Sequence, residues 1–200
     1  MNDRSPEYIR PLLVRIDRLM AERERVLVAI DGGSASGKTT LGELLQNVYG
    51  CPVFHMDDFF LRPEQRTPER FSELGGNVDR ERFLSEVLLP LREGKAVDYR
   101  RFDCKTFTIA SPSRIEPGRL NIIEGAYAMH PDLAPYYDLT VFLAVSAEKQ
   151  RERILKRNAP AQAELFFDRW IPFEQRYFAA LNVPERCDLT IFLDDQTSVP

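Results

Sequence analysis

The chain has 200 residues, 44% of them hydrophobic and 29% charged, which is typical of one folded domain and excludes a disordered chain. A net charge of −4 argues against a protein that binds nucleic acid through a broad basic surface. The three cysteines have no metal-type spacing, and no run approaches the ~18 apolar residues of a membrane span, so we expect a cytoplasmic protein that does not contact a membrane.

The first quarter of the chain alternates between helical and strand patterns. Apolar residues recur at helical spacing over 6–24, which predicts an amphipathic packing helix. The apolar run 26–30 predicts a strand that is buried on both faces of a parallel sheet. A glycine-rich turn follows, and we expect a helix over 38–49 and a second strand over 53–56.

The rest of the chain predicts further strands and helices and two irregular insertions. The insertions, about 59–78 and 94–118, are rich in proline, glycine and charge, and a helix over 80–93 separates them. Strands are expected at 120–123, 139–145 and 189–193, and helices at 147–158 and 161–181. Asp194 and Asp195 follow the last strand and are expected to be exposed. The alternation predicts an α/β fold over 1–200, a single domain with helices on both faces of a parallel sheet.

Residues 32–39 match the pattern G-x-x-x-x-G-K-[ST] without a mismatch, between a predicted strand and a predicted helix. The glycines let backbone N–H groups turn inward around phosphates, and the positive end of the helix faces the same group. In such a loop the lysine bridges the β- and γ-phosphates and the threonine hydroxyl ligates magnesium. We therefore expect ATP and Mg²⁺ to bind at Gly32, Gly33, Ser34, Ala35, Ser36, Gly37, Lys38, Thr39 and Thr40.

With these residues in place, the chain resembles the uridine kinase and phosphoribulokinase family of P-loop kinases. The resemblance covers about 26–160 and rests on the phosphate loop and four further pieces in order: Met56-Asp57-Asp58-Phe59-Phe60, Asn77-Val78-Asp79, Ile122-Ile123-Glu124-Gly125-Ala126-Tyr127, and the helix that carries Arg153 and Arg157. It implies the P-loop NTPase fold with a small helical lid near 146–160. It also implies transfer of the γ-phosphate of ATP to a hydroxyl of a nucleoside-like small metabolite.

The resemblance assigns the role of general base to Asp57. An acid at the carboxyl end of a strand beside the phosphate loop lies in the crevice where α/β proteins hold ligands. There it can accept a hydroxyl proton or hold magnesium through water. The alternative for Asp57 and Asp58 is a turn or helix N-cap pair. Asp58 is assigned to the acceptor rather than to the proton transfer.

Two further groups are expected to stabilise the phosphates. Glu124 closes a hydrophobic strand, the usual place of the acid that supports magnesium, and its alternative is a structural strand-end acid. The family's lid arginines map onto Arg153 and Arg157, which are four residues apart and so share a helix face. A guanidinium stays charged and meets phosphate oxygens in pairs. The alternative for this helix is a solvated charged face.

The acceptor site is the least specified by the sequence. Asp79 corresponds to the family's residue that binds sugar hydroxyls, and its alternative is the N-cap of the 80–93 helix. Tyr99 and Phe102 are expected to offer flat surfaces for a ring. The segment after them lacks the histidine of the uridine kinases. A kinase for a vitamin precursor or a sugar phosphate, and a nucleotide-dependent regulatory ATPase, therefore stay open as alternatives.

Overall fold

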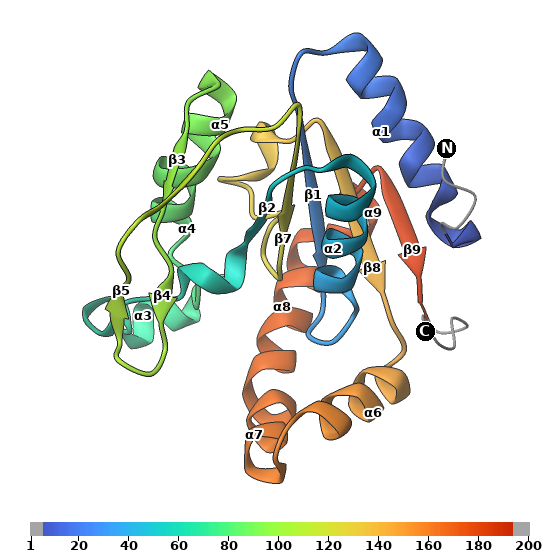
Figure 1. Ribbon diagram of the computed structural model, residues 1–200. Coiled ribbons are helices and arrows are strands. Elements are labelled where there is room, and N and C mark those ends of the chain that lie inside the picture. The colour runs from blue at the N-terminus through green and yellow to red at the C-terminus, as the bar shows by residue number, and fades with distance from the viewer. Residues whose placement is uncertain (1–5, 194–200) are drawn as a thin grey trace.

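The computed structural model describes residues 6–193, and its centre is a five-stranded parallel sheet (Figure 1). The strand order is β2-β7-β1-β8-β9. The bounds are Val26–Gly32 for β1, Val53–His55 for β2, Leu120–Glu124 for β7, Leu139–Ala144 for β8 and Leu189–Phe192 for β9. All five strands were predicted to within a few residues. The predicted α/β fold class is confirmed.

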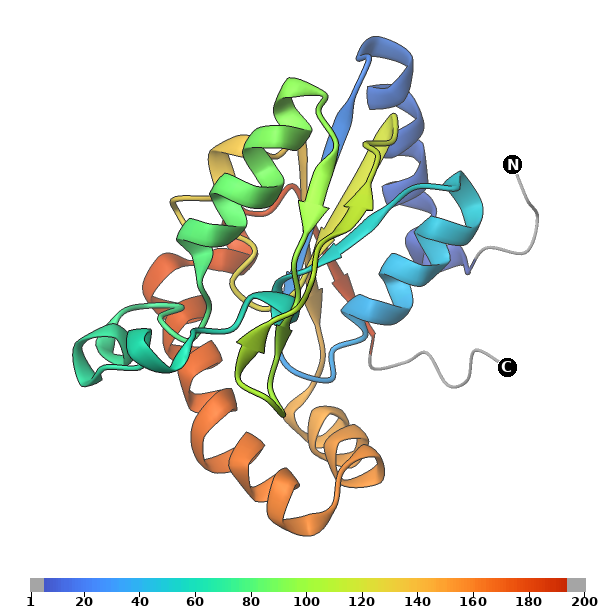
Figure 2. The same ribbon diagram turned by 60° about the vertical axis from the view of Figure 1, so that its left-hand side comes forward.

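Strand β1 is buried along its whole length because helices cover both faces of the sheet (Figure 2). Val26, Val28 and Ile30 pack in one apolar cluster with residues of α1 (Arg10–Glu22) and α2 (Lys38–Tyr49). Leu27 and Ala29 pack in the other cluster, with residues of the 80–93 segment and of α8 (Ile171–Leu181). Successive side chains of a strand point to opposite faces, so an uninterrupted apolar run is needed to fill both layers.

The helices before and after β1 match their predicted positions. A 3₁₀ turn, η1 (Glu7–Ile9), leads into α1, and together they form the helix expected over 6–24. Helix α2 begins at Lys38 and ends before Gly50, whose φ of 64° closes the helix in the left-handed region. Glycine adopts this conformation without a Cβ penalty.

The two insertions lie together at one edge of the sheet, beside β2 (Figure 1). The first carries η2 (Met56–Phe59), η3 (Pro63–Gln65) and α3 (Pro68–Ser72). The helix predicted over 80–93 runs through α4 (Arg80–Phe83), the π-helical turn η4 (Leu84–Leu88) and α5 (Leu89–Glu93). The second insertion forms two antiparallel ladders, β3 (Val97–Tyr99) with β6 (Ser113–Ile115) and β4 (Phe102–Asp103) with β5 (Thr108–Ile109).

After β8 the chain leaves the sheet in a helical excursion and then returns to the sheet. It consists of α6 (Ala147–Arg157), α7 (Pro160–Leu165) and the π-helical turn η6 (Phe166–Trp170), which continues into α8. Figure 1 shows α6 and α7 below the phosphate loop, and α8 returning along the sheet. The short elements η5 (Ala134–Tyr136) and α9 (Val183–Arg186) complete the described fold.

Two further expectations from the sequence concern the acids after β9 and the absence of a membrane span. Asp194 and Asp195 lie outside the residues that the structure describes. Within the described range, no helix is long and apolar enough to cross a membrane.

Candidate active site

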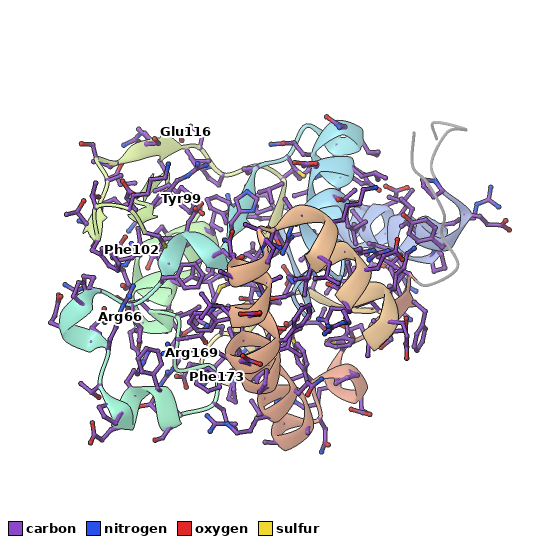
Figure 3. All side chains as sticks on the ribbon, turned by 90° about the horizontal axis from the view of Figure 1, so that it is seen from below. Arg66, Tyr99, Phe102, Glu116, Arg169 and Phe173 are labelled. Carbon is purple, nitrogen blue, oxygen red and sulfur yellow. The ribbon has the colours of Figure 1, made fainter. Side chains whose placement is uncertain are left out.

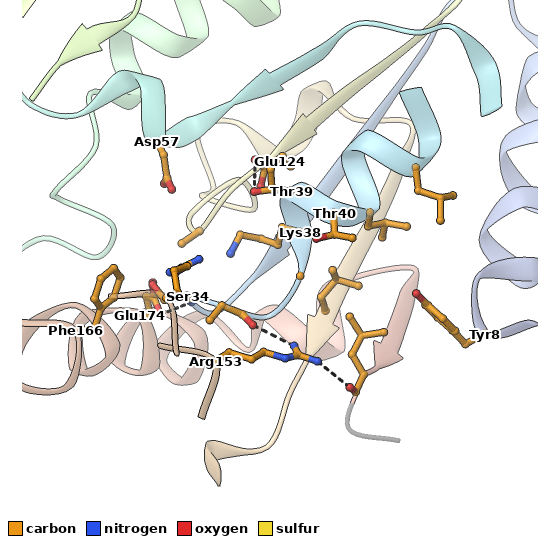
Figure 4. A pocket seen from close by; sticks show the side chains of 18 residues that line it. Tyr8, Ser34, Lys38, Thr39, Thr40, Asp57, Glu124, Arg153, Phe166 and Glu174 are labelled. Carbon is orange, nitrogen blue, oxygen red and sulfur yellow. Dashed lines mark hydrogen bonds between the residues drawn. The ribbon is translucent and has the colours of Figure 1, made fainter. Parts of the chain in front are cut away.

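A cavity of about 460 Å³ opens beside the N-terminus of α2, at the carboxyl ends of β1 and β7 (Figure 4). This volume lies in the range of small-molecule sites. Ten of the predicted site residues line it: Ser34, Ala35, Gly37, Lys38, Thr39, Thr40, Asp57, Glu124, Arg153 and Arg157. Segments that are more than a hundred residues apart in the chain therefore meet around one space.

The phosphate loop has the backbone that its glycines and its small residues allow. Gly37 has a φ of 105° and Ala35 a φ of 59°, so the chain turns twice through the left-handed region. At Gly32 an added Cβ would lie 2.6 Å from the carbonyl oxygen of Leu143, which excludes any side chain there. These turns arrange backbone groups around a concave centre, which is the arrangement that binds anions.

Lys38 places its ammonium group inside this loop. Its Nζ donates to the carbonyl oxygens of Gly32 at 2.8 Å and Gly33 at 2.9 Å. The residue is only 9% exposed. A cation held in such a cavity attracts a polyphosphate strongly, because little water screens it.

Thr39 and Glu124 form an oxygen-rich wall next to the lysine. The Thr39 hydroxyl donates to Glu124 Oε1 at 3.1 Å, and the same oxygen lies 2.5 Å from Nδ1 of His55. This hydrogen bond raises the pKa of His55. His55 was not predicted as a site residue, although the sheet register places it opposite Glu124 on the neighbouring strand.

The donor set of this wall suits a magnesium ion that is shared with a phosphate group. Hydroxyl and carboxylate oxygens are the ligands that Mg²⁺ prefers, and the ion usually keeps several waters and substrate oxygens. Among residues 6–193, no group of three or more histidine, cysteine or acidic side chains is placed to hold a metal alone. Thr39 and Glu124, with Asp57 across the cavity, would hold the ion together with its waters and the nucleotide.

Asp57 faces the cavity from η2, directly after β2 (Figure 4). The residue is accessible from the cavity, but the surrounding walls remove much of the water around its carboxyl group. This desolvation raises the pKa of Asp57; Glu124 and Asp58 raise it further, while Lys38 and His55 oppose the shift. A carboxylate with a raised pKa is a stronger base than a free one, which is what proton abstraction requires.

The two arginines predicted for the lid line the cavity from α6, but their contacts differ. Arg153 donates to the carbonyl oxygens of Ala35 at 3.1 Å, Ser36 at 3.3 Å and Leu193 at 3.2 Å. Arg157 is exposed, and its guanidinium carbon lies 5.6 Å from the centre of the Phe166 ring. Arg153 thus binds the phosphate loop itself, whereas the exposed Arg157 side chain lies over the Phe166 ring.

The four residues predicted for the acceptor do not line this cavity. The ring of Tyr99 is 2% exposed and packs against Phe54 and Phe59, and its hydroxyl donates to Asp58 Oδ2 at 2.7 Å. Phe102 is 5% exposed, and Figure 3 shows it beside Arg66, whose guanidinium lies 5.5 Å from the ring centre. A ring cannot stack on a side chain that is already covered. For these two aromatic residues the structure favours a supporting role over the predicted contact.

Asp79 has the capping role that was its alternative. Its Oδ1 accepts a hydrogen bond from the Arg82 backbone at 3.1 Å and so caps α4. Its Oδ2 is buried and, among the described residues, accepts no hydrogen bond. Capping uses only one oxygen, so the predicted contact with a sugar hydroxyl stays a prediction.

Three further residues support the site although the sequence reasoning missed them. Asp31 is fully buried and accepts hydrogen bonds from the backbone N–H groups of Gly32 and Met129 and from the hydroxyl of Tyr177. Burial raises the pKa of Asp31 to about 6. An acid at the end of an apolar strand was the available signal for it. Unlike Asp31, Glu174 and Tyr8 line the cavity itself, and nothing local in the sequence marks either of them.

A family model and several curated proteins match this chain. The model of the phosphoribulokinase / uridine kinase family matches residues 27–161. "Uridine kinase-like protein 4" of Arabidopsis thaliana is 28% identical over 145 residues, which are 68% of this chain and 31% of that protein. The chain spans less than two thirds of the length of the curated relatives that it matches.

Two solved structures share the fold over almost their whole length. A candidate fructose transport system kinase from Silicibacter sp. TM1040 has a TM-score of 0.71 at 22% identity, covering 93% of this chain and 99% of its own. A possible uridine kinase from Bacillus stearothermophilus has a TM-score of 0.65 at 23% identity, covering 90% and 99%. Similarity at these identities shows the P-loop NTPase fold, which was predicted.

Proposed function

The chain belongs to the phosphoribulokinase / uridine kinase family, and from this premise we propose that it is an ATP-dependent kinase whose acceptor is a hydroxyl of a small, nucleoside-like metabolite. The observation that carries the proposal is the meeting of Lys38, Thr39, Glu124 and Asp57 around one cavity. Phosphoryl transfer needs a group for the phosphates, oxygens for magnesium and a base for the attacking hydroxyl. The cavity offers all three.

In this proposal the phosphates of ATP lie in the loop and displace the Lys38 ammonium from the carbonyl oxygens of Gly32 and Gly33. Arg157 turns toward the transferred group and stabilises its charge. The bound magnesium would neutralise phosphate charge, and Thr39 and Glu124 would orient it. Asp57 receives the proton of the acceptor hydroxyl.

The nucleotide base would extend from the phosphates toward the apolar end of the cavity. Tyr8, Leu44 and Leu193 line this end, and the Arg153 guanidinium lies next to it. A flat base is well matched to an aromatic ring, aliphatic side chains and a guanidinium plane. This arrangement supports a nucleotide donor rather than inorganic polyphosphate.

The acceptor would lie on the other side of Asp57, against the two insertions. The buried Asp79 Oδ2 accepts no hydrogen bond among the described residues and lies 3.9 Å from Arg62 Nε and 3.7 Å from Arg82 Nε, so it could accept one from a hydroxyl group there. One observation also favours an anionic acceptor such as a sugar phosphate. The side chain of Arg101 is 64% exposed, and its Nε lies 3.2 Å from Asp58 Oδ2. A positively charged group therefore lies on the acceptor side, next to Asp57.

A panel of acceptors tests the proposal. ADP release is measured with MgATP and with ribonucleosides, their 2′-deoxy analogues, sugar phosphates and vitamin precursors that carry a hydroxyl group. We expect one of the diol-bearing compounds to stimulate ADP release, and the Lys38→Ala variant to show no stimulation. Slow ADP release that no acceptor changes would instead support the regulatory ATPase.

A further inference from the structure

Two helices outside the phosphate loop bind every polar group of Ser34. Glu174 on α8 accepts from the Ser34 backbone N–H at 2.9 Å and from its hydroxyl at 2.6 Å. Gln150 on α6 donates from Nε2 to the Ser34 carbonyl oxygen at 2.8 Å. We call these three residues the Ser34 clamp. The clamp joins the loop to the helices at the beginning and at the end of the lid excursion.

The space around Gly33, the residue before Ser34, is a second observation that bears on the clamp. The motif G-x-x-x-x-G-K-[ST] allows any residue at this position, and Gly33 is not in the left-handed region. A Cβ at Gly33 would lie 2.9 Å from Gln150 Nε2 and 3.5 Å from Glu174 Oε2. The glycine leaves room for the Gln150 amide of the clamp, which a larger residue would displace.

The charge of Glu174 makes its contacts strong. The residue is 5% exposed, and its carboxylate shares the cavity with Lys38 and Asp57 (Figure 4). Hydrogen bonds that a carboxylate accepts from N–H and O–H groups are roughly twice as strong as neutral ones. A buried carboxylate is also costly unless it is bonded, so it holds its partners in place. Burial raises the pKa of Glu174, as expected of a carboxyl group in this position.

We propose that Glu174 is a positioning residue for nucleotide binding and phosphoryl transfer: through the Ser34 clamp it fixes the phosphate loop against the lid helices. This inference rests on the proposed function. The amides of the loop bind phosphate only when their directions are fixed beforehand, because reordering them would reduce the binding energy. The loop between Gly32 and Lys38 is short, and the clamp holds it near its middle.

The test compares four variants of the full chain. Glu174→Ala removes both hydrogen bonds to Ser34. Glu174→Gln keeps the shape, because the carboxamide oxygen can accept from the Ser34 N–H and its NH₂ group can donate to the hydroxyl. Gln150→Ala removes the other arm, and Gln175→Ala is the matched control on the exposed side of α8. Affinities for MgATP and MgADP are measured by calorimetry, and thermal unfolding is followed without nucleotide.

We expect Glu174→Ala to weaken MgATP binding about tenfold, because two charge-assisted hydrogen bonds are lost. Gln150→Ala should weaken it about threefold. Glu174→Gln should fall between Glu174→Ala and wild type, because it keeps both hydrogen bonds to Ser34 but makes them neutral. Gln175→Ala should stay close to wild type. A purely structural role would lower the unfolding temperature of Glu174→Ala but leave the affinity of the folded protein unchanged, and that result would overturn the inference. If Glu174→Ala does not fold, Glu174→Asp takes its place, since the shorter side chain withdraws the carboxylate from Ser34.

The Lys38→Ala variant separates this inference from the proposed function. Wild-type MgATP affinity and turnover in Lys38→Ala would refute the kinase proposal itself. Loss of binding in Lys38→Ala together with unchanged affinity in Glu174→Ala and Gln150→Ala would refute the Ser34 clamp alone.

Discussion

The two sides of the cavity are built in different ways. On the phosphate-loop side, the residues that line the cavity come from one consecutive stretch, 34–40, and their arrangement follows the backbone of the loop. On the acceptor side, Asp58, Asp79, Tyr99 and Phe102 come from separate segments, and the structure uses their side chains for capping, packing and hydrogen bonding. A role carried by the backbone follows from a local motif. A role carried by a side chain depends on which way the fold turns it.

Lys38→Ala gives the largest expected effect and tests the phosphate-loop side. Phosphoryl transfer should be abolished, because the ammonium is the cation within the loop. Thermal stability should stay near wild type, since Nζ donates to two loop carbonyls and, among residues 6–193, to no core side chain. ADP production and thermal unfolding are measured on the same preparation. Wild-type turnover in a folded variant would mean that the loop does not act as proposed.

Asp57→Asn tests the point where the two sides meet. We expect kcat to fall by about 10² to 10⁴, the usual effect of losing a general base, while the affinity for ATP changes little. Steady-state kinetics with the acceptor found in the panel gives both values. Because desolvation by the cavity walls raises the pKa of Asp57, the wild-type rate should fall as the pH drops through that pKa, and the variant should lack this limb. Turnover within a few-fold of wild type would make Asp58 the candidate base.

The buried carboxyl group of Asp31, at the base of the phosphate loop, should make the free energy of unfolding depend on pH. Its pKa is raised from 3.8 to about 6, so the folded state binds the proton more tightly than the unfolded state. The free energy of unfolding should therefore fall as pH rises from about 4 to 6, by about 3 kcal/mol in total. Asp31→Asn should lack this part of the slope. Urea unfolding of both proteins across this range gives the two slopes, and equal slopes would contradict the assignment.

Arg153 and Arg157 offer a comparison within the lid. We expect Arg157→Ala to lower kcat by about 10- to 100-fold with little change in the KM for ATP, because it would act on the transferred charge. Arg153→Ala should also raise the KM for ATP, since Arg153 bonds to Ala35 and Ser36 in the loop. Initial rates at varied ATP separate the two patterns. If neither variant changes kcat or the KM for ATP, this side of α6 is a solvated charged surface without a role in catalysis.

Asp79 gives the smallest expected effect and tests the acceptor side. Asp79→Ala should lower the stability by about 1 kcal/mol through loss of the α4 cap, while Asp79→Asn keeps the cap. If the acceptor is a ribonucleoside, both variants should reduce the preference for it over its 2′-deoxy analogue. Denaturant unfolding and competitive rates provide the two measurements. Unchanged preference in both variants would leave Asp79 with the capping role alone.

Much of the fold was readable from the chain because its signals are local. The apolar runs at 26–30, 120–123 and 139–145 each match a buried strand, and α2 has the predicted bounds. The helix expected over 161–181 instead contains the π-helical turn η6, and the second insertion pairs into two ladders. Pairing and helical register depend on contacts between segments, which periodicity does not encode.

The sequence by itself determined the phosphate loop, the parallel sheet and the position of Asp57 and Glu124 near one crevice. It did so because strand ends and a glycine-rich loop have the same geometry wherever they occur. Only the tertiary structure decided that Tyr99 turns inward to hold Asp58 and that Glu174 reaches Ser34, 140 residues away in the chain. The contacts of a side chain are set by packing between distant elements, and no local pattern records them.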